Sequence, residues 1–452
     1  MRLCKGVVLS ALSLVLVPIH GLRAQESKAA PSRHITLEEA VDMALKHNHV
    51  IRLAALKVEE KEHTKDVARS AYFPLLRNDS NVLHVSDTQL IQISAGALGT
   101  VAGTPVPARS AVLNQGGLTF VTSGTSLTQP LTQLLRIKSA NDIALAELNA
   151  TRDKERQTEN GVTLGVHQIY YRILIAQTHR EATVAKIQAF EALSKERVEQ
   201  VKFGSTLEEE AIESRAQSLE AKQDLLSTDL MLSDLTMKLN DAIGLPLTTQ
   251  LALEAGVKQV GETCEREECL QVALKSHPEI AEARADVEKA SAGVRLAKRQ
   301  YLPDVEAYAR YSYQNNVPFL ARNFGTFGVH VGFDIFDGGR KRAAVKEHNA
   351  QLAQAQENLA RLAEEVELRV QTAHNKLERT RQMVKVSEEL MAFRAEARRV
   401  STRQLQEGSA LRSQLDAATA HELDAKTLLL QSQLDYIQAR DEMTEAMGLR
   451  PD

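Results

Sequence analysis

A group of closely spaced carboxylates is the part of this sequence that most suggests chemistry. Glu208, Glu209, Glu210 and Glu213 follow a glycine–serine pair at positions 204–205. Carboxylates held close together raise one another's pKa and attract cations, so the group predicts a cation-sensitive surface. The alternative is that acidic residues in a first helical turn only offset the helix dipole, an explanation that suits Glu208 and Glu209 at least as well.

Two cysteines form a second candidate pair. Cys264 and Cys269 lie close together at the start of a helical pattern. In an exported protein such a pair can form a lasting disulfide, but these two can meet only if Cys264 precedes the helix. The alternatives are a local disulfide with a structural role only and two unpaired thiols.

Motifs for catalysis and for ligand binding are missing. The sequence has no phosphate-binding loop, HExxH pair, nucleophile elbow or CxxC, and His47 and His49 fall at an expected corner between helices. The net charge of -4 favours neither nucleic acid nor an acidic partner. We therefore expect no enzymatic activity, no cofactor, no metal site and no nucleic-acid partner.

The N-terminus, residues 1–24, has the pattern of a secretory signal peptide. Arg2 and Lys5 precede an apolar run at 7–19, and Leu22-Arg23-Ala24 follows before Gln25. Export is therefore expected. After this segment no run of eighteen apolar residues occurs, so a role in a membrane would fall to strands.

The longest helical pattern, from about residue 341 to 447, must position any site at its ends. Its apolar and small residues form two seams, whereas a helix with one partner needs only one. Two seams predict neighbours on both sides; a long coiled-coil dimer is the alternative. The limb 341–406 would be about 100 Å long at about 1.5 Å per residue. The seams run through Leu352, Ala355, Leu359, Leu362 and Val366, and through Ala353, Ala360, Ala363, Val370, Ala373 and Leu377.

The chain contains an internal duplication. Segments of the first half recur in the second half in the same order, so the two halves read as copies. The aligned segments are Tyr72-Phe73-Pro74 with Tyr301-Leu302-Pro303, Gly204-Ser205 with Gly408-Ser409, and Gly244-Leu245 with Gly448-Leu449.

Each copy predicts the same order of elements: a short helix, a longer helix ended by a proline, a strand pair, a very long helix and a returning helix. The second strand pair alternates apolar and polar residues over about ten positions, which is typical of outer-membrane barrel strands; a soluble sandwich is the alternative. The boundaries are residues 35–250 for the first repeat, with strands at about 76–93 and 117–129 and a tip at 203–207, and residues 264–449 for the second, with strands at about 304–314 and 325–336 and a tip at 407–411.

The ordered set of features, present twice, resembles the TolC-like outer-membrane efflux protein family. It includes the proline before each strand pair, the junction at 337–340, the glycine–serine tips and the closing Gly-Leu pairs. The resemblance implies a mainly helical fold with a β-barrel portion. Three protomers would build one twelve-stranded outer-membrane barrel, continued by a periplasmic helical barrel that closes at its tips.

The sequence departs from the family at the expected closing residues. Family members carry an aspartate ring after the second tip glycine, where this chain has Gln414 and Ala417, with Asp416 out of step. The matching positions after the first tip are Glu210 and Glu213. The aperture candidates are therefore Glu210, Glu213, Gln414 and Asp416, and the candidate docking tips are Gly204, Ser205, Gly408 and Ser409.

The resemblance implies a passive exit duct in the cell outer membrane that extends into the periplasm. It would be a homotrimer in contact with outer-membrane lipid, and would work with a periplasmic adaptor protein and an inner-membrane pump in tripartite efflux or type I secretion. The alternative is a periplasmic adaptor or a structural coiled-coil spacer. Duplicated hairpins with amphipathic strand pairs favour the channel.

Overall fold

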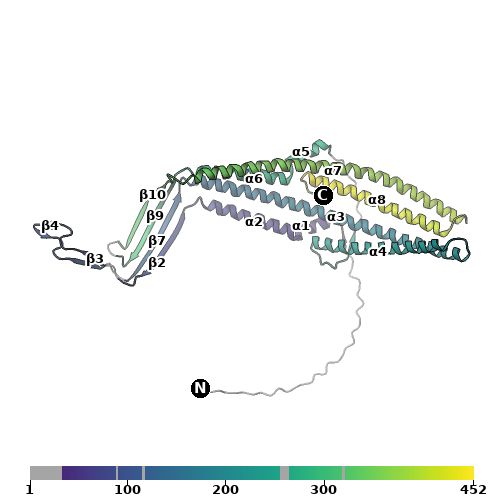
Figure 1. Cartoon of the computed structure of the whole chain (residues 1–452), viewed down its shortest axis with the longest axis horizontal. Helices are drawn as coiled ribbons and strands as arrows, with labels where there is room; N and C mark the ends of the chain where they lie inside the picture. The colour runs from purple at the N-terminus through teal and green to yellow at the C-terminus, as the bar shows by residue number, and fades with distance from the viewer. Residues whose placement is uncertain (1–32, 88–89, 115–117, 255–263, 318–320, 452) are drawn as a thin grey trace, which may run out of the picture.

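The computed structural model describes residues 33–87, 90–114, 118–254, 264–317 and 321–451. The predicted signal peptide at 1–24 lies outside this part of the chain. The molecule is elongated, with a sheet at one end and long helices that run from the sheet to the opposite end (Figure 1).

The two repeats contain the same series of four helices. Thr36 begins the first helix with a capping box that includes Glu39, and Gly244 ends the fourth in the left-handed conformation, which favours glycine. The first series is α1 (Leu37–His47), α2 (His49–Ser70), α3 (Leu134–Lys202) and α4 (Glu208–Ile243); the second is α5 (Arg266–Ser276), α6 (Pro278–Arg299), α7 (Arg340–Gln406) and α8 (Arg412–Ala446).

The long helices form a wall with two open edges. Near the sheet the neighbours run in the order α2, α3, α6, α7, and near the opposite end in the order α4, α3, α8, α7. The predicted first seam of α7 is half-buried from Leu352 to Leu362 and buried at Val366. The second seam is exposed at Ala353 and Ala360, but it is buried at Val370 and Leu377, which pack in one cluster with residues of α5 and α8.

A buried polar group joins the two repeats. His167 of α3 and Asp441 of α8 are 0% and 1% exposed, and the His167 Nδ1 and Asp441 Oδ2 atoms are 2.7 Å apart. The hydroxyl of Tyr171 donates to the same carboxylate oxygen at 3.3 Å. Burial, followed by the nearby Asp441 charge, raises the pKa of Tyr171. This group fixes how α3 and α8 pack against each other.

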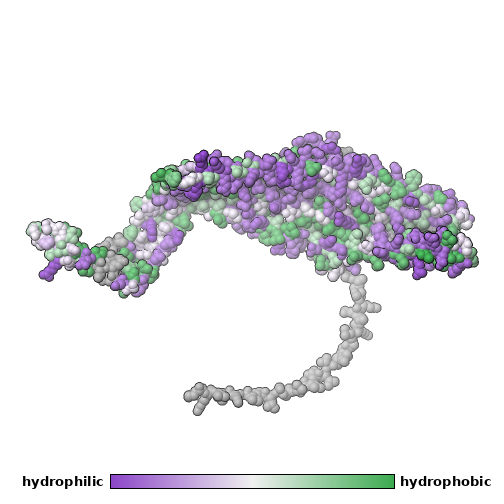
Figure 2. Space-filling model, viewed as in Figure 1, coloured by the Kyte–Doolittle hydropathy of each residue, from purple (hydrophilic) through white to green (hydrophobic). Residues whose placement is uncertain are grey.

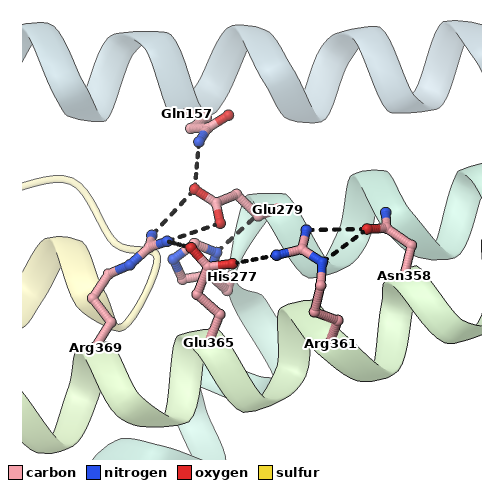
Figure 3. A network of polar contacts seen from close by, with 7 residues as sticks. All are labelled: Gln157, His277, Glu279, Asn358, Arg361, Glu365 and Arg369. Carbon is pink, nitrogen blue, oxygen red and sulfur yellow. Dashed lines mark hydrogen bonds and ion pairs between the residues drawn. The ribbon is translucent and has the colours of Figure 1, made fainter.

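A second network ties α6 and α7 to α3 (Figure 3). The Arg369 guanidinium binds both carboxylate oxygens of Glu279 at 3.1 Å, and Gln157 of α3 donates to one of them. His277 caps α6 by accepting the backbone N–H of Glu279, and burial lowers the pKa of its imidazole. A bidentate arginine–carboxylate pair is geometrically specific, so it sets the register between these helices.

The main sheet has four antiparallel strands in the order β10, β9, β7, β2. Its apolar face, as we call it, carries Phe327, Val329 and Val331 of β10 beside the alternate residues of β9 from Val305 to Tyr313; on β7 and β2 the same face also carries serine, threonine and asparagine. The opposite face carries charged side chains, among them Glu306 and Arg310. The strands are β2 (Leu75–His84), β7 (Thr119–Pro130), β9 (Asp304–Asn315) and β10 (Asn323–Gly332).

Two predicted strands are wrong in extent. The strand expected at 76–93 ends at His84, where its partner β7 begins at Thr119. The strand expected at 325–336 runs from Asn323 to Gly332, because the next partner residue would be Pro303, which has no N–H to donate. The remaining strands are β3 (Leu90–Ile93) paired with β6 (Ala111–Asn114), β4 (Thr100–Val101) paired with β5 (Thr104–Pro105), and β1 (Arg33–Ile35) parallel to β8 (Leu251–Leu253).

Cys264 and Cys269 form a disulfide, with their Cα atoms 5.8 Å apart. Cys264 precedes α5, as the bridge requires, and Cys269 is buried within it. The closed loop is so short that it should stabilise the fold by no more than about 2 kcal/mol. We expect replacement of both cysteines with alanine to leave assembly intact, as measured by native mass spectrometry. Loss of the oligomer would show that the bridge is essential.

Candidate functional site

Both helical hairpin tips have the same backbone geometry. Gly204 and Gly408 have φ angles of 64° and 71°, a region that favours glycine. The serine after each glycine donates its backbone N–H to a carbonyl five residues earlier, Gln200 at 2.9 Å and Gln404 at 2.9 Å. Figure 1 places both tips at the end of the molecule farthest from the sheet.

The glutamates of the first tip are held by their own hairpin. Glu210 Oε2 lies 2.9 Å from Arg197 Nη1 of α3 and accepts a hydrogen bond from Thr206 at 2.8 Å. Glu213 accepts from Gln217 on the next turn at 3.1 Å. The Glu210 side chain is still 48% exposed and Glu213 is exposed as well, so both carboxylates can also contact solvent ions.

The second tip has a different set of polar contacts. The Gln414 side chain caps α8 by accepting the backbone N–H of Leu411 at 3.1 Å. Asp416 Oδ1 lies 3.1 Å from Arg412 Nε one turn earlier, and its side chain is 24% exposed. Neither side chain has an interaction with Glu210 or Glu213 within the part of the chain that the structure describes. The four aperture candidates therefore form two separate groups.

A cavity of about 240 Å³ separates the two hairpins near their tips. Phe190, Leu193 and Arg197 of α3 line one side, and Gln414 and Ala417 of the second hairpin line the other. Arg197 therefore contacts both Glu210 and the space between the repeats. The arrangement can hold ions or polar groups, but among the described residues no three histidine, cysteine, aspartate or glutamate side chains could hold a metal ion together.

Arg197 is the residue that the sequence interpretation missed. It lies seven positions before Gly204, and Glu210 lies six after it, so folding the hairpin at the glycine brings the two side chains to one level. The equivalent positions of the second hairpin are Ser401 and Gln414, which are uncharged. Comparing residues at nearly equal distances before and after each tip glycine would have found this pair.

No helix among the described residues is long and apolar enough to span a membrane.

Residues 269–449, from α5 to the end of α8, match the family model described as outer membrane efflux protein. The match spans nearly all of the second repeat. Among curated proteins, no sequence matches the chain.

The chain as a whole has the fold of several solved outer-membrane proteins. It is similar to the CmeC outer membrane channel of Campylobacter jejuni, with 13% identity, a TM-score of 0.73 and coverage of 91% of this chain and 85% of that one. It is also similar to the outer membrane protein VceC of Vibrio cholerae, with 15% identity, a TM-score of 0.72 and coverage of 92% and 97%. It is similar as well to the MtrE outer membrane channel of Neisseria gonorrhoeae, with 16% identity, a TM-score of 0.72 and coverage of 92% of this chain and 89% of that one. The resemblance and the mainly helical fold class with a strand portion are thus confirmed.

Proposed function

We propose that this protein is the outer-membrane exit duct of a tripartite efflux or type I secretion system. It would be a passive conduit that extends into the periplasm and assembles as a homotrimer. The observation that carries the proposal is that the sheet and both levels of the helical wall are open at the same two edges. One edge consists of β2, α2 and α4, and the other of β10 and α7. The two edges differ, so copies can join head to tail into a closed ring.

The sheet supports a ring inserted in lipid. Its apolar face is exposed, and β2 and β10 each leave a row of unpaired backbone groups. Unpaired strand edges are very unfavourable in a bilayer, so a sheet in lipid must close. Pairing of β2 with β10 of the next copy closes it, and three copies of four strands make the twelve strands of the family's barrel.

The two helical edges carry matching apolar stripes at the same distance from the hairpin tips. Ile212, Leu219 and Leu226 of α4 form an exposed stripe at heptad spacing. Val386, Phe393 and Val400 of α7 form the same kind of stripe, and the two stripes are between 38% and 74% exposed. Counted from Gly204 and Gly408, the residues of the two stripes lie at equal distances from their tips. Packing α4 against α7 of a neighbouring copy would bury both stripes.

The opposite, charged face of the sheet would line the barrel. The two kinds of hairpin tip would contact the periplasmic adaptor, which links the duct to an inner-membrane pump. In this assignment Gly204, Ser205, Gly408 and Ser409 are the docking positions. A periplasmic adaptor or a coiled-coil spacer would not need the exposed apolar face that this sheet presents.

The test of this function is mass measurement combined with bilayer recording. The wild-type protein, purified in detergent from the membrane fraction, should be a trimer and should conduct ions after reconstitution. A stable monomer inserted in bilayers, or a soluble protein that does not insert, would contradict the proposal.

We further propose that Glu210 and Glu213 line the periplasmic aperture. Three copies would place six of these carboxylates around one axis. Arg197 offsets the charge of each Glu210, so the attraction of cations rests mainly on the three Glu213 carboxylates. Replacing both with glutamine should lower the cation preference of single channels by up to about tenfold, since the residues are partly exposed and their charges are screened. The same change should weaken block by divalent ions. Glu220→Gln on the same helix is the control. Unchanged selectivity and block would mean that other residues line the constriction.

A further inference from the structure

The level at which the sheet meets the helices is basic, although the whole chain has a net charge of -4. Four chain segments cross this level, and we call them together the junction band. In each one lysine and arginine outnumber aspartate and glutamate. The segments are residues 65–75, 130–139, 295–304 and 333–346.

Helix polarity does not account for these charges. α2 and α6 end at the junction band, where basic residues are favourable because they lie near a negative helix pole. α3 and α7 begin there, yet neither has an acidic residue in its first turn. α1, α4, α5 and α6 have one or more, whereas α2 and α8, which begin away from the band, also have none. Cations near the start of a helix are unfavourable, so the helix dipole does not explain Arg136 of α3 or the basic residues 340–342 of α7.

The acidic side chains at α7 are already engaged. Asp334 pairs with Arg340 at 3.4 Å and Lys341 at 3.5 Å. Asp337 accepts the backbone N–H groups of Lys341 and Gly339 at 3.0 and 2.9 Å, and these hydrogen bonds, the one from Lys341 above all, lower its pKa.

The surplus cations of α7 are free of carboxylates. Arg342 and Lys346 are exposed, and no described carboxylate lies within ion-pair distance of either. They are separated by one helical turn, so they occupy the same side of α7. These two cations are available to an anion from outside the chain.

Exposed apolar residues accompany the cations. Ile335 and Phe336, directly after β10, are 93% and 89% exposed, and Phe333 lies beside them with Lys341 Nζ 5.4 Å above its ring. Phe73 and Tyr301 are exposed at two other segments of the band. At the corner where the sheet meets α7, Figure 2 shows a green patch directly beside a purple one. Aromatic rings next to lysine and arginine are typical of the boundary between a bilayer and water.

We propose that the junction band binds the headgroups of anionic phospholipids, with Arg342 and Lys346 contacting the phosphate. Phe333, Ile335 and Phe336, which follow β10 and are exposed, lie against the acyl chains. The inference rests on the proposed insertion of the sheet in a bilayer, and it fixes where the periplasmic leaflet meets the protein. Charge complementarity selects anionic over zwitterionic lipid.

The test is native mass spectrometry of the full-length protein released from vesicles of phosphatidylethanolamine and phosphatidylglycerol. Wild-type protein should retain phosphatidylglycerol in excess of its share of the vesicle. The double variant Arg342→Gln with Lys346→Gln should lose about tenfold or more of this retention, since each cation near an anionic surface contributes several-fold. Arg381→Gln with Lys385→Gln, also exposed on α7 but far from the band, should retain it fully.

The charge-conserving variant Arg342→Lys with Lys346→Arg distinguishes loss of charge from misfolding. It should retain as much phosphatidylglycerol as the wild type. Equal retention in the double variant and the wild type would overturn the inference while leaving the channel proposal in place, provided that the same samples are trimers that conduct ions. A wild-type protein that does not insert in the vesicles would overturn both.

Discussion

The double variant Leu219→Glu with Leu226→Glu should not form trimers. Each leucine lies on the exposed stripe of α4 that we place against α7 of the next copy. Burying a leucine contributes about 1.5–3 kcal/mol, and a glutamate buried there without a partner is strongly unfavourable. The loss occurs at every interface of the ring. Size-exclusion chromatography with light scattering in detergent should therefore show monomers.

Two variants control for this experiment. Leu219→Met with Leu226→Met keeps the apolar volume and should still give trimers. Ser227→Glu adds a charge to α4 about a quarter-turn from the stripe and should assemble as well. If the glutamate double variant forms normal trimers, α4 does not pack against α7 in the assembly.

Asp441→Ala should be the most destabilising single substitution in the helical wall. Removing a buried acceptor leaves its hydrogen-bond donors unsatisfied, which costs about 1–3 kcal/mol for each donor. Here the change would leave His167 and Tyr171 without their shared acceptor in a fully buried position. The melting temperature measured by near-ultraviolet circular dichroism should fall by several degrees or more.

The exposed pair between Lys46 and Asp42 offers a matched comparison. Its atoms are 2.6 Å apart, as close as in the buried pair, but the side chains are 65% and 61% exposed. Asp42→Ala should therefore cost less than about 1 kcal/mol. Asp441→Asn, which keeps an acceptor for His167, should fall between the two. Equal melting temperatures for all three variants would show that the buried group does not stabilise the wall.

Local rules predicted much of the fold. Proline before each strand pair, the tip glycines and the heptad-like seams of α7 have direct steric or packing consequences, and the elements begin and end close to the expected positions. The strand ends at His84 and Gly332 were not predictable in this way, because each depends on the register in which the strand pairs with its partner. A single strand carries no signal for the length of its neighbour.

The polar contacts were harder to predict for a related reason. His167 and Asp441 are 274 positions apart, and nothing near either residue indicates that they meet. Arg197 and Glu210 are an intermediate case, because a hairpin with a known tip relates them by reflection. The side-chain contacts that hold the repeats together thus depend on the pairing of α3 with α8, which the duplication alone does not specify.

The difference between the two edges of the protomer has a consequence for mixed populations. A subunit with glutamates on its α4 stripe still has an intact α7 stripe, so it can join a wild-type neighbour on one side and then block closure. In a cell that makes equal amounts of both subunits, only about one trimeric ring in every eight would contain no variant subunit. Such an allele would be dominant over the wild type. Two alleles damaged at opposite edges would not rescue each other, because any ring that contains either one has a defective contact.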